Sequence, residues 1–388
     1  MAYDHEVTAL LADLVSIDSV NPGLVPGAAG ESRIVDALSA RLSASGFALT
    51  IVRPPGGEGR PSLIAAPPLV DGAPTIILNG HLDTVGVAGM SKPFVPHVEG
   101  DRLHGRGAAD MKGGVAALVV AAERAVASGA PVRPVLALVA DEEDANLGSE
   151  AVIAALPGLG IHPDVCLVAE PTDLALTRSL RGFGVIRVRF SGRAAHSSQA
   201  ELGVNALTHL GRLLHAVDEH APSVRRGGGD LMVTLASGGA SAFVVPDQAE
   251  CLVEMRTAPD QDIADVLAKV ESLLDPSWET EVALLAGRAG WRMDGDGPAP
   301  ELAAVLSARL GTGPTFDAPY WMEAPLWQAV CPTVVCGPSG GGLHAVDEWV
   351  SLSQVANFTD ALTHALHIWT LGDRQPRMTA LNDQRSNR

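Results

Sequence analysis

The sequence predicts an α/β protein in which helices cover a mostly parallel sheet and a smaller α+β unit is inserted. Two patterns predict this fold class. Outside the middle of the chain, short and continuously apolar runs alternate with Ala-rich helical stretches, which is typical of parallel strands buried on both faces. In the middle, apolar and charged residues alternate, which indicates strands with one face in solvent. With 388 residues, the chain is long enough for two domains.

The first part of the chain contains helical patterns followed by buried runs. Two sets of apolar residues at helical spacing each predict an amphipathic helix. Three continuous apolar runs each predict a buried strand, and Ala-rich segments near 112–128 and 148–157 predict helices between them. The helical sets are Val7, Leu10, Leu11, Leu14 and Val15, then Ile34, Leu38 and Leu42, and the apolar runs are 75–78, 135–140 and 165–169.

The middle of the chain predicts six elements in the order strand, helix, strand, strand, helix, strand. This order matches the split βαβ arrangement of a ferredoxin-like two-layer unit. We therefore expect an inserted domain over residues 179–288. The patterns behind it are Ile186, Val188 and Phe190; Leu207, Leu210, Leu214 and Val217; 232–235; Cys251, Val253 and Met255; Ile263, Val266, Leu267 and Val270; and 282–285.

The α/β pattern returns after about residue 293. The apolar run 333–335 predicts a strand, and a helical pattern follows near 352–370. The larger, metal-binding domain is therefore expected to comprise residues 1–178 and 289–371. Residues 372–388 are polar and have no periodicity, which predicts a disordered tail.

Composition excludes several classes of partner. A formal net charge of −18 argues against nucleic acid and against an anionic membrane surface, because both need clustered Lys and Arg. Four isolated cysteines, without a C-x-x-C pattern, suit a reducing compartment. The first residues lack a signal-peptide pattern, and no apolar run approaches the length of a membrane span. We therefore expect a soluble, cytoplasmic protein.

Candidate metal ligands follow the predicted strands. His81 and Asp83 come after the run 75–78, and Glu170 directly follows the run 165–169. In open α/β sheets, sites form beyond the carboxyl ends of the strands, so these side chains are expected at one edge. The remaining candidates are Glu142 and Glu143 after the run 135–140, His344 in a Gly-rich loop, and Asp110 in the loop 105–110.

This donor set favours two metal ions. Two histidines with several carboxylates and no thiolate fit zinc, manganese or cobalt. One ion could not use all these ligands and still bind water, whereas two ions that share a carboxylate could. Each residue also has a structural interpretation by itself. Asp110 could cap a helix, Glu142 and Glu143 could begin a solvated helix, and His81 could be a buried histidine with its polar atoms satisfied.

Several motifs in order resemble one family. Up to about residue 370, the chain resembles the metallopeptidase superfamily that contains acetylornithine deacetylase, succinyl-diaminopimelate desuccinylase, aminoacylase and glutamate carboxypeptidase. The motifs are Asn79-Gly80-His81-Leu82-Asp83-Thr84-Val85, Gly105-Arg106-Gly107-Ala108-Ala109-Asp110-Met111-Lys112-Gly113-Gly114, Asp141-Glu142-Glu143 and Glu170-Pro171.

The resemblance implies a role for each matched residue. His81, Asp110 and Glu170 would hold one zinc ion, while Asp110, Glu143 and His344 would hold the other. Asp83 would orient His81, and Glu142 would act as the general base. A cis peptide bond is also implied between Asp110 and Met111.

The inserted domain resembles the lid of that family, which often forms the dimer. His196 would reach the active site of the partner subunit and stabilise the oxyanion, and Arg256 would bind the substrate carboxylate. Both residues also have a structural interpretation, since His196 could cap a turn and Arg256 could be a surface strand residue. Phe243 stands where the family usually has an Asn that helps to bind substrate, which puts the usual substrate in doubt.

The segment from Glu323 to His344 is most similar to acetylornithine deacetylase. This similarity implies that Glu323 and Gly337 contact the substrate. Trp321 and Met322 replace smaller or more polar residues of the family, and together with Phe243 they leave the choice of substrate open.

Three functions stay open from the sequence. The first is a deacylase for a small N-acyl amino acid, and the second is a dipeptidase or carboxypeptidase with the same metals. The third is a metal- or ligand-binding protein without activity. The third predicts loss of a ligand or of the base, but Glu142 and the five expected ligands are all present.

Overall fold

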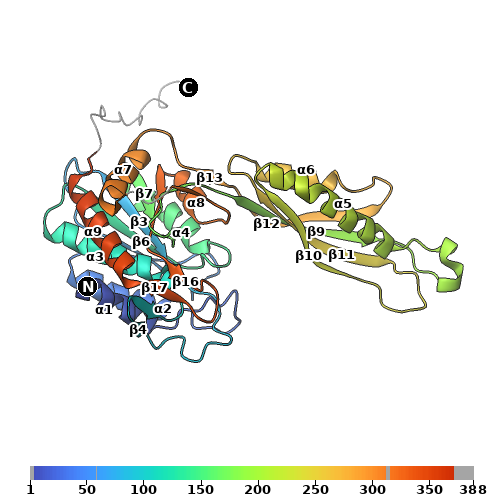
Figure 1. Ribbon diagram of the computed structural model, residues 1–388, viewed down its shortest axis with the longest axis horizontal. Helices are drawn as coiled ribbons and strands as arrows, with labels where there is room; N and C mark the ends of the chain where they lie inside the picture. The colour runs from blue at the N-terminus through green and yellow to red at the C-terminus, as the bar shows by residue number, and fades with distance from the viewer. Residues whose placement is uncertain (1–3, 58, 312–314, 371–388) are drawn as a thin grey trace, which may run out of the picture. The chain divides into compact units, whose positions relative to one another are not determined.

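The computed structural model describes residues 4–57, 59–311 and 315–370, and the chain within them forms two units (Figure 1). The first unit comprises residues within 4–173, 296–311 and 337–370, and the second comprises residues within 174–295 and 315–336. The tail predicted to be disordered, 372–388, lies outside the described residues.

A hydrogen-bonded sheet forms the centre of the first unit, with strands in the order β1-β2-β6-β3-β7. Strand β3 pairs in parallel with β6 and with β7, whereas β2 is antiparallel to β6 and to β1 at the edge. Strands β3 and β7 are buried along their whole length, as their apolar runs predict, and so is β2, for which the sequence analysis predicted no strand. The strands are β1 (Ala48–Val52), β2 (Ser62–Ala66), β3 (Thr75–His81), β6 (Arg133–Val139) and β7 (Val165–Val168).

Helices cover this sheet. In Figure 1, strands β3 and β6 have helices α3 and α9 on one side and helix α4 on the other. Helix α3 contacts both strands, and its Ala-rich sequence lets α1 and α9 pack closely on it. The fold class predicted from the sequence is confirmed. The helices of this unit are α1 (His5–Val15), α2 (Ser32–Ala44), α3 (Gly113–Ala127), α4 (Leu147–Ala155), η2 (Pro157–Leu159), α7 (Pro298–Leu310) and α9 (Leu352–Ile368).

A small antiparallel sheet, ordered β16-β17-β5-β4, brings together segments that are far apart in the sequence. Its strand β5 leads into the loop that carries Asp110, and its strands β16 and β17 flank the loop that carries His344. This sheet therefore joins two of the loops with predicted ligands. Its strands are β4 (His97–Glu99), β5 (Arg102–His104), β16 (Gly340–Gly341) and β17 (Trp349–Ser351).

The second unit contains the predicted α+β arrangement. Its four strands run β9, β10, β11, β12 along the chain and lie in the order β10-β11-β9-β12, all antiparallel. Helices α5 and α6 follow the first and third strands, which is the split βαβ order of a ferredoxin-like unit. The elements are β9 (Gly182–Ser191), η3 (Ser197–Leu202), α5 (Ala206–Arg226), β10 (Asp230–Gly238), β11 (Gln248–Thr257), α6 (Ile263–Glu271) and β12 (Glu279–Arg288).

The core of this unit lies between one face of the sheet and the two helices. Alternate residues of β9, such as Ile186 and Val188, are fully buried, which agrees with the period of a half-exposed strand. On α5, Leu213 is fully buried, while Leu214 of the predicted set is only partly buried. The buried face of α5 therefore includes Leu210 and Val217, as predicted, but Ala206 and Leu213 lie in the core in place of Leu207 and Leu214.

Shorter elements complete the second unit. Strands β13 and β14 pair with β8 on either side, and helix α8 packs on β15. Their bounds are β8 (Thr177–Leu180), β13 (Trp291–Arg292), β14 (Phe316–Ala318), α8 (Ala324–Gln328) and β15 (Thr333–Val335).

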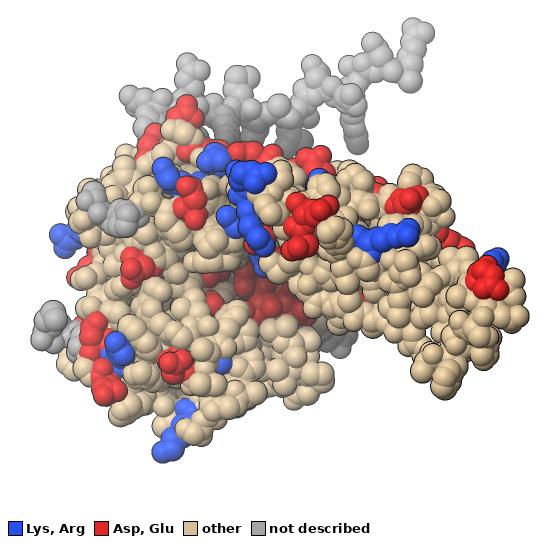
Figure 2. Space-filling view, turned by 45° about the vertical axis from the view of Figure 1, so that its right-hand side comes forward, with Lys and Arg blue, Asp and Glu red and all other residues tan. Residues whose placement is uncertain are grey.

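On the face shown in Figure 2, groups of acidic residues and groups of basic residues lie among a larger number of uncharged residues. Within the described ranges, no helix combines the length and the apolar character that crossing a membrane requires.

Candidate metal centre

The predicted ligands lie at the carboxyl ends of the parallel strands. His81 is the last residue of β3, and Glu170 follows the end of β7 by two residues. Glu142 and Glu143 come shortly after β6. Because β6, β3 and β7 are parallel neighbours, these side chains gather at one edge of the sheet.

Asp110 lies between the two histidines. Its Oδ1 atom is 3.0 Å from Nε2 of His81, and its Oδ2 atom is 3.3 Å from Nε2 of His344. Nε2 of His344 is also 3.0 Å from Oε2 of Glu143. Each oxygen of one carboxylate therefore faces a different imidazole, which is the arrangement expected of a carboxylate shared by two cations.

Among the residues that the structure describes, two overlapping sets of donor atoms could hold a cation. One set is His81, Glu142 and Glu170, and the other is His81, Asp110 and Glu143; within each set the donor atoms lie within 4.8 Å of one another. Imidazole nitrogen and carboxylate oxygen are the donors that zinc, manganese and cobalt accept. The residues present therefore fit divalent cations.

The loop of Asp110 has an unusual backbone. Within the segment η1 (Ala108–Lys112), the backbone angles of Asp110 and Met111 are not helical, and the peptide bond between these two residues is cis, as the family resemblance implied. Gly107 precedes the turn with a φ of 76°, a conformation that favours glycine. A Cβ atom on Gly107 would also lie only 2.6 Å from the side chain of Thr84.

The carboxylates of the site stabilise positive charge. Burial opposes protonation of His81, but the hydrogen bond with Asp110 and the charge of Glu170 outweigh burial and raise the pKa of His81 well above its usual value. Hydrogen bonds with Asp110 and Glu143 raise the pKa of His344 to about 10. Burial and the charge of Asp110 raise the pKa of Glu143. The electrostatic field of the site thus favours cations.

Asp83 is buried, and the hydrogen bonds of its carboxylate go to groups other than the His81 ring. Its oxygens accept hydrogen bonds from the backbone N–H groups of Glu142 and Glu143 at 3.1 and 3.2 Å. The nearest partner of Nδ1 of His81 is the backbone oxygen of Asp83 at 3.1 Å, while the carboxylate oxygen is 3.7 Å away. Asp83 therefore holds His81 and the two glutamates in one arrangement.

Several residues that the sequence did not indicate support this site. Asn21 donates from Nδ2 to Asp83 at 2.7 Å and to Asp141 at 3.1 Å. Arg60 pairs with Asp141 at 2.9 Å and with the fully buried Glu31 at 2.6 Å. These side chains link the loop before α2 to the edge of the sheet. No local pattern could have found them, because their partners are distant in the sequence.

Gly337 lies against the backbone that carries Glu170. A Cβ atom at this position would be 2.4 Å from the backbone oxygen of Ala169 and 2.6 Å from that of Glu170. Its N–H group donates to the hydroxyl of Thr172 at 3.0 Å. The absence of a side chain at Gly337 therefore allows close packing behind Glu170. The substrate contact implied for Gly337 by the resemblance stays a prediction.

The other predicted residues lie in the second unit. The exposed His196 caps η3, because its Nδ1 accepts a hydrogen bond from the N–H of Ser198 at 3.2 Å. Arg256, on β11, pairs with Glu254 at 2.5 Å, and its guanidinium lies 5.4 Å from the ring centre of Phe183. Glu323 is fully buried at the start of α8.

Phe243, at the position where the family usually has Asn, is 71% exposed. Its backbone oxygen accepts a hydrogen bond from the N–H of Ser197 at 3.0 Å, beside His196. An apolar side chain therefore extends into solvent next to the predicted oxyanion donor.

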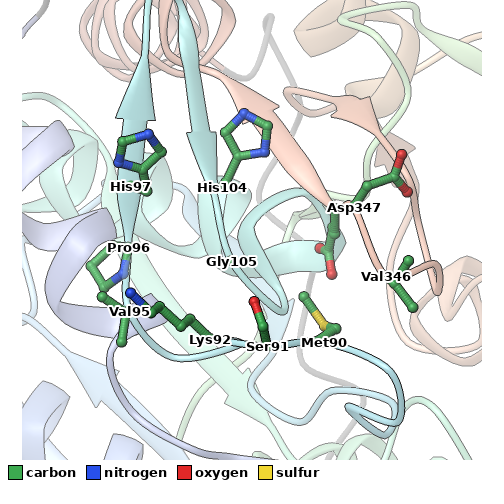
Figure 3. A pocket seen from close by; sticks show the side chains of 11 residues that line it. Met90, Ser91, Lys92, Val95, Pro96, His97, His104, Gly105, Val346 and Asp347 are labelled. Carbon is green, nitrogen blue, oxygen red and sulfur yellow. The ribbon is translucent and has the colours of Figure 1, made fainter.

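A separate cavity of about 440 Å³ lies in the first unit (Figure 3). His97 and His104 stand on its wall from neighbouring strands. Gly105 and Glu348 also line it. Within the described part of the chain, its lining contains none of the predicted metal ligands.

Comparison with known proteins identifies relatives that match almost the whole chain. A sequence model of Peptidase family M20/M25/M40 matches residues 77–367. The N-acetyl-L-citrulline deacetylase of Xanthomonas campestris pv. campestris is 30% identical and covers 92% of this chain and 96% of its own. The acetylornithine deacetylase of Vibrio vulnificus is 27% identical, covering 91% of this chain and 96% of its own.

Solved structures show the same fold. A tripeptidase from Staphylococcus aureus has a TM-score of 0.78 at 17% identity, covering 94% of this chain and 97% of that chain. A dinuclear metal-binding peptidase of the M20 family from Bacillus subtilis has a TM-score of 0.69 at 15% identity, covering 93% and 97%. The resemblance inferred from the motifs is thereby confirmed. The chain belongs to peptidase family M20/M25/M40, whose members are metal-dependent hydrolases of amide bonds.

Proposed function

We propose that this chain removes the acyl group from a small N-acyl amino acid, using two divalent metal ions, with zinc as the first choice. One observation carries the proposal: the two carboxylate oxygens of Asp110 face different histidines, at 3.0 and 3.3 Å. The deacetylases that match over most of their length support the choice of a deacylase.

His81, Asp110 and Glu170 would hold one ion, and Asp110, Glu143 and His344 the other. When bound, the ions would polarise the amide carbonyl and lower the pKa of water. His81, Asp110 and Glu143 are anchored by buried backbone and side-chain contacts, so the ligands need little rearrangement to bind.

Glu142 would act as the general base. Its carboxylate lies within 4.8 Å of the donor atoms of His81 and Glu170, and its backbone N–H is fixed by Asp83. It would take a proton from the attacking water and then give that proton to the leaving amine nitrogen. General acid–base catalysis of this kind contributes about 10²- to 10⁴-fold in rate.

His196 and Arg256 would act on the substrate from the second unit. The Nδ1 atom of His196 accepts the N–H of Ser198, so in the neutral ring Nε2 carries the proton. That tautomer can donate to the oxyanion that forms during attack. Arg256 would bind the substrate carboxylate in place of its partner Glu254. Glu323 and Gly337 are proposed substrate contacts on the same grounds of resemblance.

We propose that residues 179–288 form a lid domain through which two chains make a homodimer. Residues 1–178 and 289–371 would form the catalytic domain, and the protein would be located in the cytoplasm. Size-exclusion chromatography with light scattering tests the dimer, and a monomer at micromolar concentration would contradict it.

A substrate screen tests the function. Metal-free protein is loaded with zinc, cobalt or manganese and assayed on N-acetylornithine, N-acetylcitrulline and other N-acyl amino acids, with dipeptides in parallel. We expect two ions per chain and preferential cleavage of an N-acyl amino acid. Preferential cleavage of dipeptides would instead identify the alternative, a dipeptidase or carboxypeptidase with the same ions. Absence of hydrolysis by a fully loaded protein would contradict both.

A further inference from the structure

Glu348 holds the loop that carries Asp110. Its carboxylate belongs to a residue only 1% exposed, and both oxygens accept hydrogen bonds from that loop. Oε1 accepts from the N–H groups of Ala109 at 3.0 Å and Asp110 at 3.2 Å. Oε2 accepts from the N–H of Gly107 at 2.9 Å and from the guanidinium of Arg106 at 2.7 Å.

The same two segments are also joined in other ways. Arg106 donates from Nη2 to the backbone oxygen of Ala345 at 2.9 Å, next to His344. The N–H of Gly105 donates to the backbone oxygen of Glu348 at 3.2 Å. Residues 105–110 and 344–348 are thus connected by six hydrogen bonds centred on Arg106 and Glu348. We call these contacts the Arg106–Glu348 clamp.

The clamp lies behind two of the proposed ligands of one ion. Asp110 ends the first clamped segment and His344 begins the second, and their side chains are 3.3 Å apart. The ligands of the other ion depend less on the clamp, because His81 belongs to β3 and Glu170 follows β7, both in the central sheet. Loss of the clamp should therefore affect the two ions unequally.

We propose that Glu348 is a positioning residue that keeps Asp110 and His344 at the separation at which both bind one ion. This role rests on the dinuclear site proposed above. Removing one oxygen acceptor would leave buried N–H groups of the Asp110 loop without a partner, and the loop would shift to satisfy them. Residues behind metal ligands typically change metal affinity by about 10- to 100-fold when they are lost.

The test is a titration of the metal-free full-length chain with Co²⁺, followed by calorimetry and by visible absorption. The variant is Glu348→Gln, which has nearly the same shape but turns one acceptor into a donor. The matched control is Glu99→Gln, an exposed glutamate on β4 of the same small sheet. We expect two Co²⁺ ions to bind tightly to the wild type and to the control. In Glu348→Gln, one ion should bind as before and the other about 10- to 100-fold more weakly.

Each outcome decides between the proposals. Two unchanged affinities in Glu348→Gln, or equal weakening of both, would overturn the role of Glu348 while leaving the dinuclear site intact. A wild type that binds fewer than two ions would overturn the dinuclear site itself and this role with it. If Glu348→Gln does not fold, judged by circular dichroism, Arg106→Lys replaces it. Arg106→Lys keeps the positive charge but cannot bind Glu348 and Ala345 at the same time as the guanidinium does. The affinity for one Co²⁺ ion should therefore fall. If the affinities for both ions stay unchanged, the proposed role of Glu348 is overturned.

Discussion

The predicted metal ligands of the first unit and the predicted substrate contacts of the second unit differ in what surrounds them. His81 is fully buried, and Asp110 is held on both sides, by histidines at its carboxylate and by Glu348 at its backbone. His196 is exposed, and Arg256 already pairs with Glu254. The first set is therefore preorganised by buried contacts, whereas the second set would have to exchange a local contact for the proposed substrate.

This difference agrees with what each set is proposed to bind. A pair of cations needs several donors at fixed positions, which is best achieved at strand ends of a buried sheet. Recognition of a flexible substrate needs side chains that can reach it, and half-exposed strand and loop positions allow this. Variants of both sets test this contrast between buried and exposed residues, and the largest effect is expected at Glu142.

The variant Glu142→Gln tests whether catalysis depends on the buried residues of the first unit. We expect kcat to fall by about 10²- to 10⁴-fold, because the proton acceptor is lost. Metal content should stay at the wild-type value, since Glu142 is not a proposed ligand. Steady-state kinetics and metal analysis measure both quantities, with Glu150→Gln on α4 as the control. Full activity of Glu142→Gln would place the base elsewhere.

The variant Gly337→Ala tests how tightly Glu170 is held. The added methyl group would meet the backbone oxygens of Ala169 and Glu170, so one of the segments must move. We expect a loss of about 1–3 kcal/mol in the free energy of unfolding, measured by urea denaturation.

The matched control is Gly158→Ala, where an added Cβ atom meets nothing within 4 Å. A change within about 0.5 kcal/mol is expected there. Equal stability of Gly337→Ala and the wild type would show that the backbone behind Glu170 is less constrained than its packing indicates.

Metal affinity should rise with pH. The pKa of His344 is raised to about 10 and that of His81 well above its usual value, so both rings carry a proton near pH 7 in the metal-free protein. Each proton must leave before the nitrogen binds a cation, so affinity increases by up to about tenfold per pH unit for each proton displaced. Calorimetry of Zn²⁺ binding in buffers of different ionisation enthalpy measures this release. Binding without proton release would contradict the charge state derived for the two histidines.

The smallest effect is expected in the second unit. Glu254→Gln removes the partner of Arg256 and leaves the guanidinium available to a substrate carboxylate. A partly exposed pair of this kind contributes about 0–1 kcal/mol, so KM should fall by no more than about fivefold with kcat unchanged.

The control for this effect is Glu250→Gln on the same strand, which breaks an exposed pair with Arg189 instead. A KM that rises in Glu254→Gln, or that falls equally in both variants, would argue against Arg256 as the carboxylate contact.

Much of the fold could be predicted because the periodicity of the sequence reports burial directly. Continuous apolar runs predicted β3, β6 and β7, and alternation predicted β9 and β11. The order of elements then indicated a parallel sheet and a ferredoxin-like unit. Since parallel strands end at the same edge, the proximity of His81, Glu143 and Glu170 also followed from the sequence.

Only the tertiary structure decided how these ligands are supported. Asn21 reaches Asp83 across 62 residues, and Glu348 reaches Gly107 across 241. Such contacts leave no periodic trace, because a polar side chain in a loop has the same local pattern whether it is solvated or buried. The sequence by itself determined which donors follow the strands, whereas long-range packing determined which buried groups hold them, because hydrogen-bond partners are selected by distance in space.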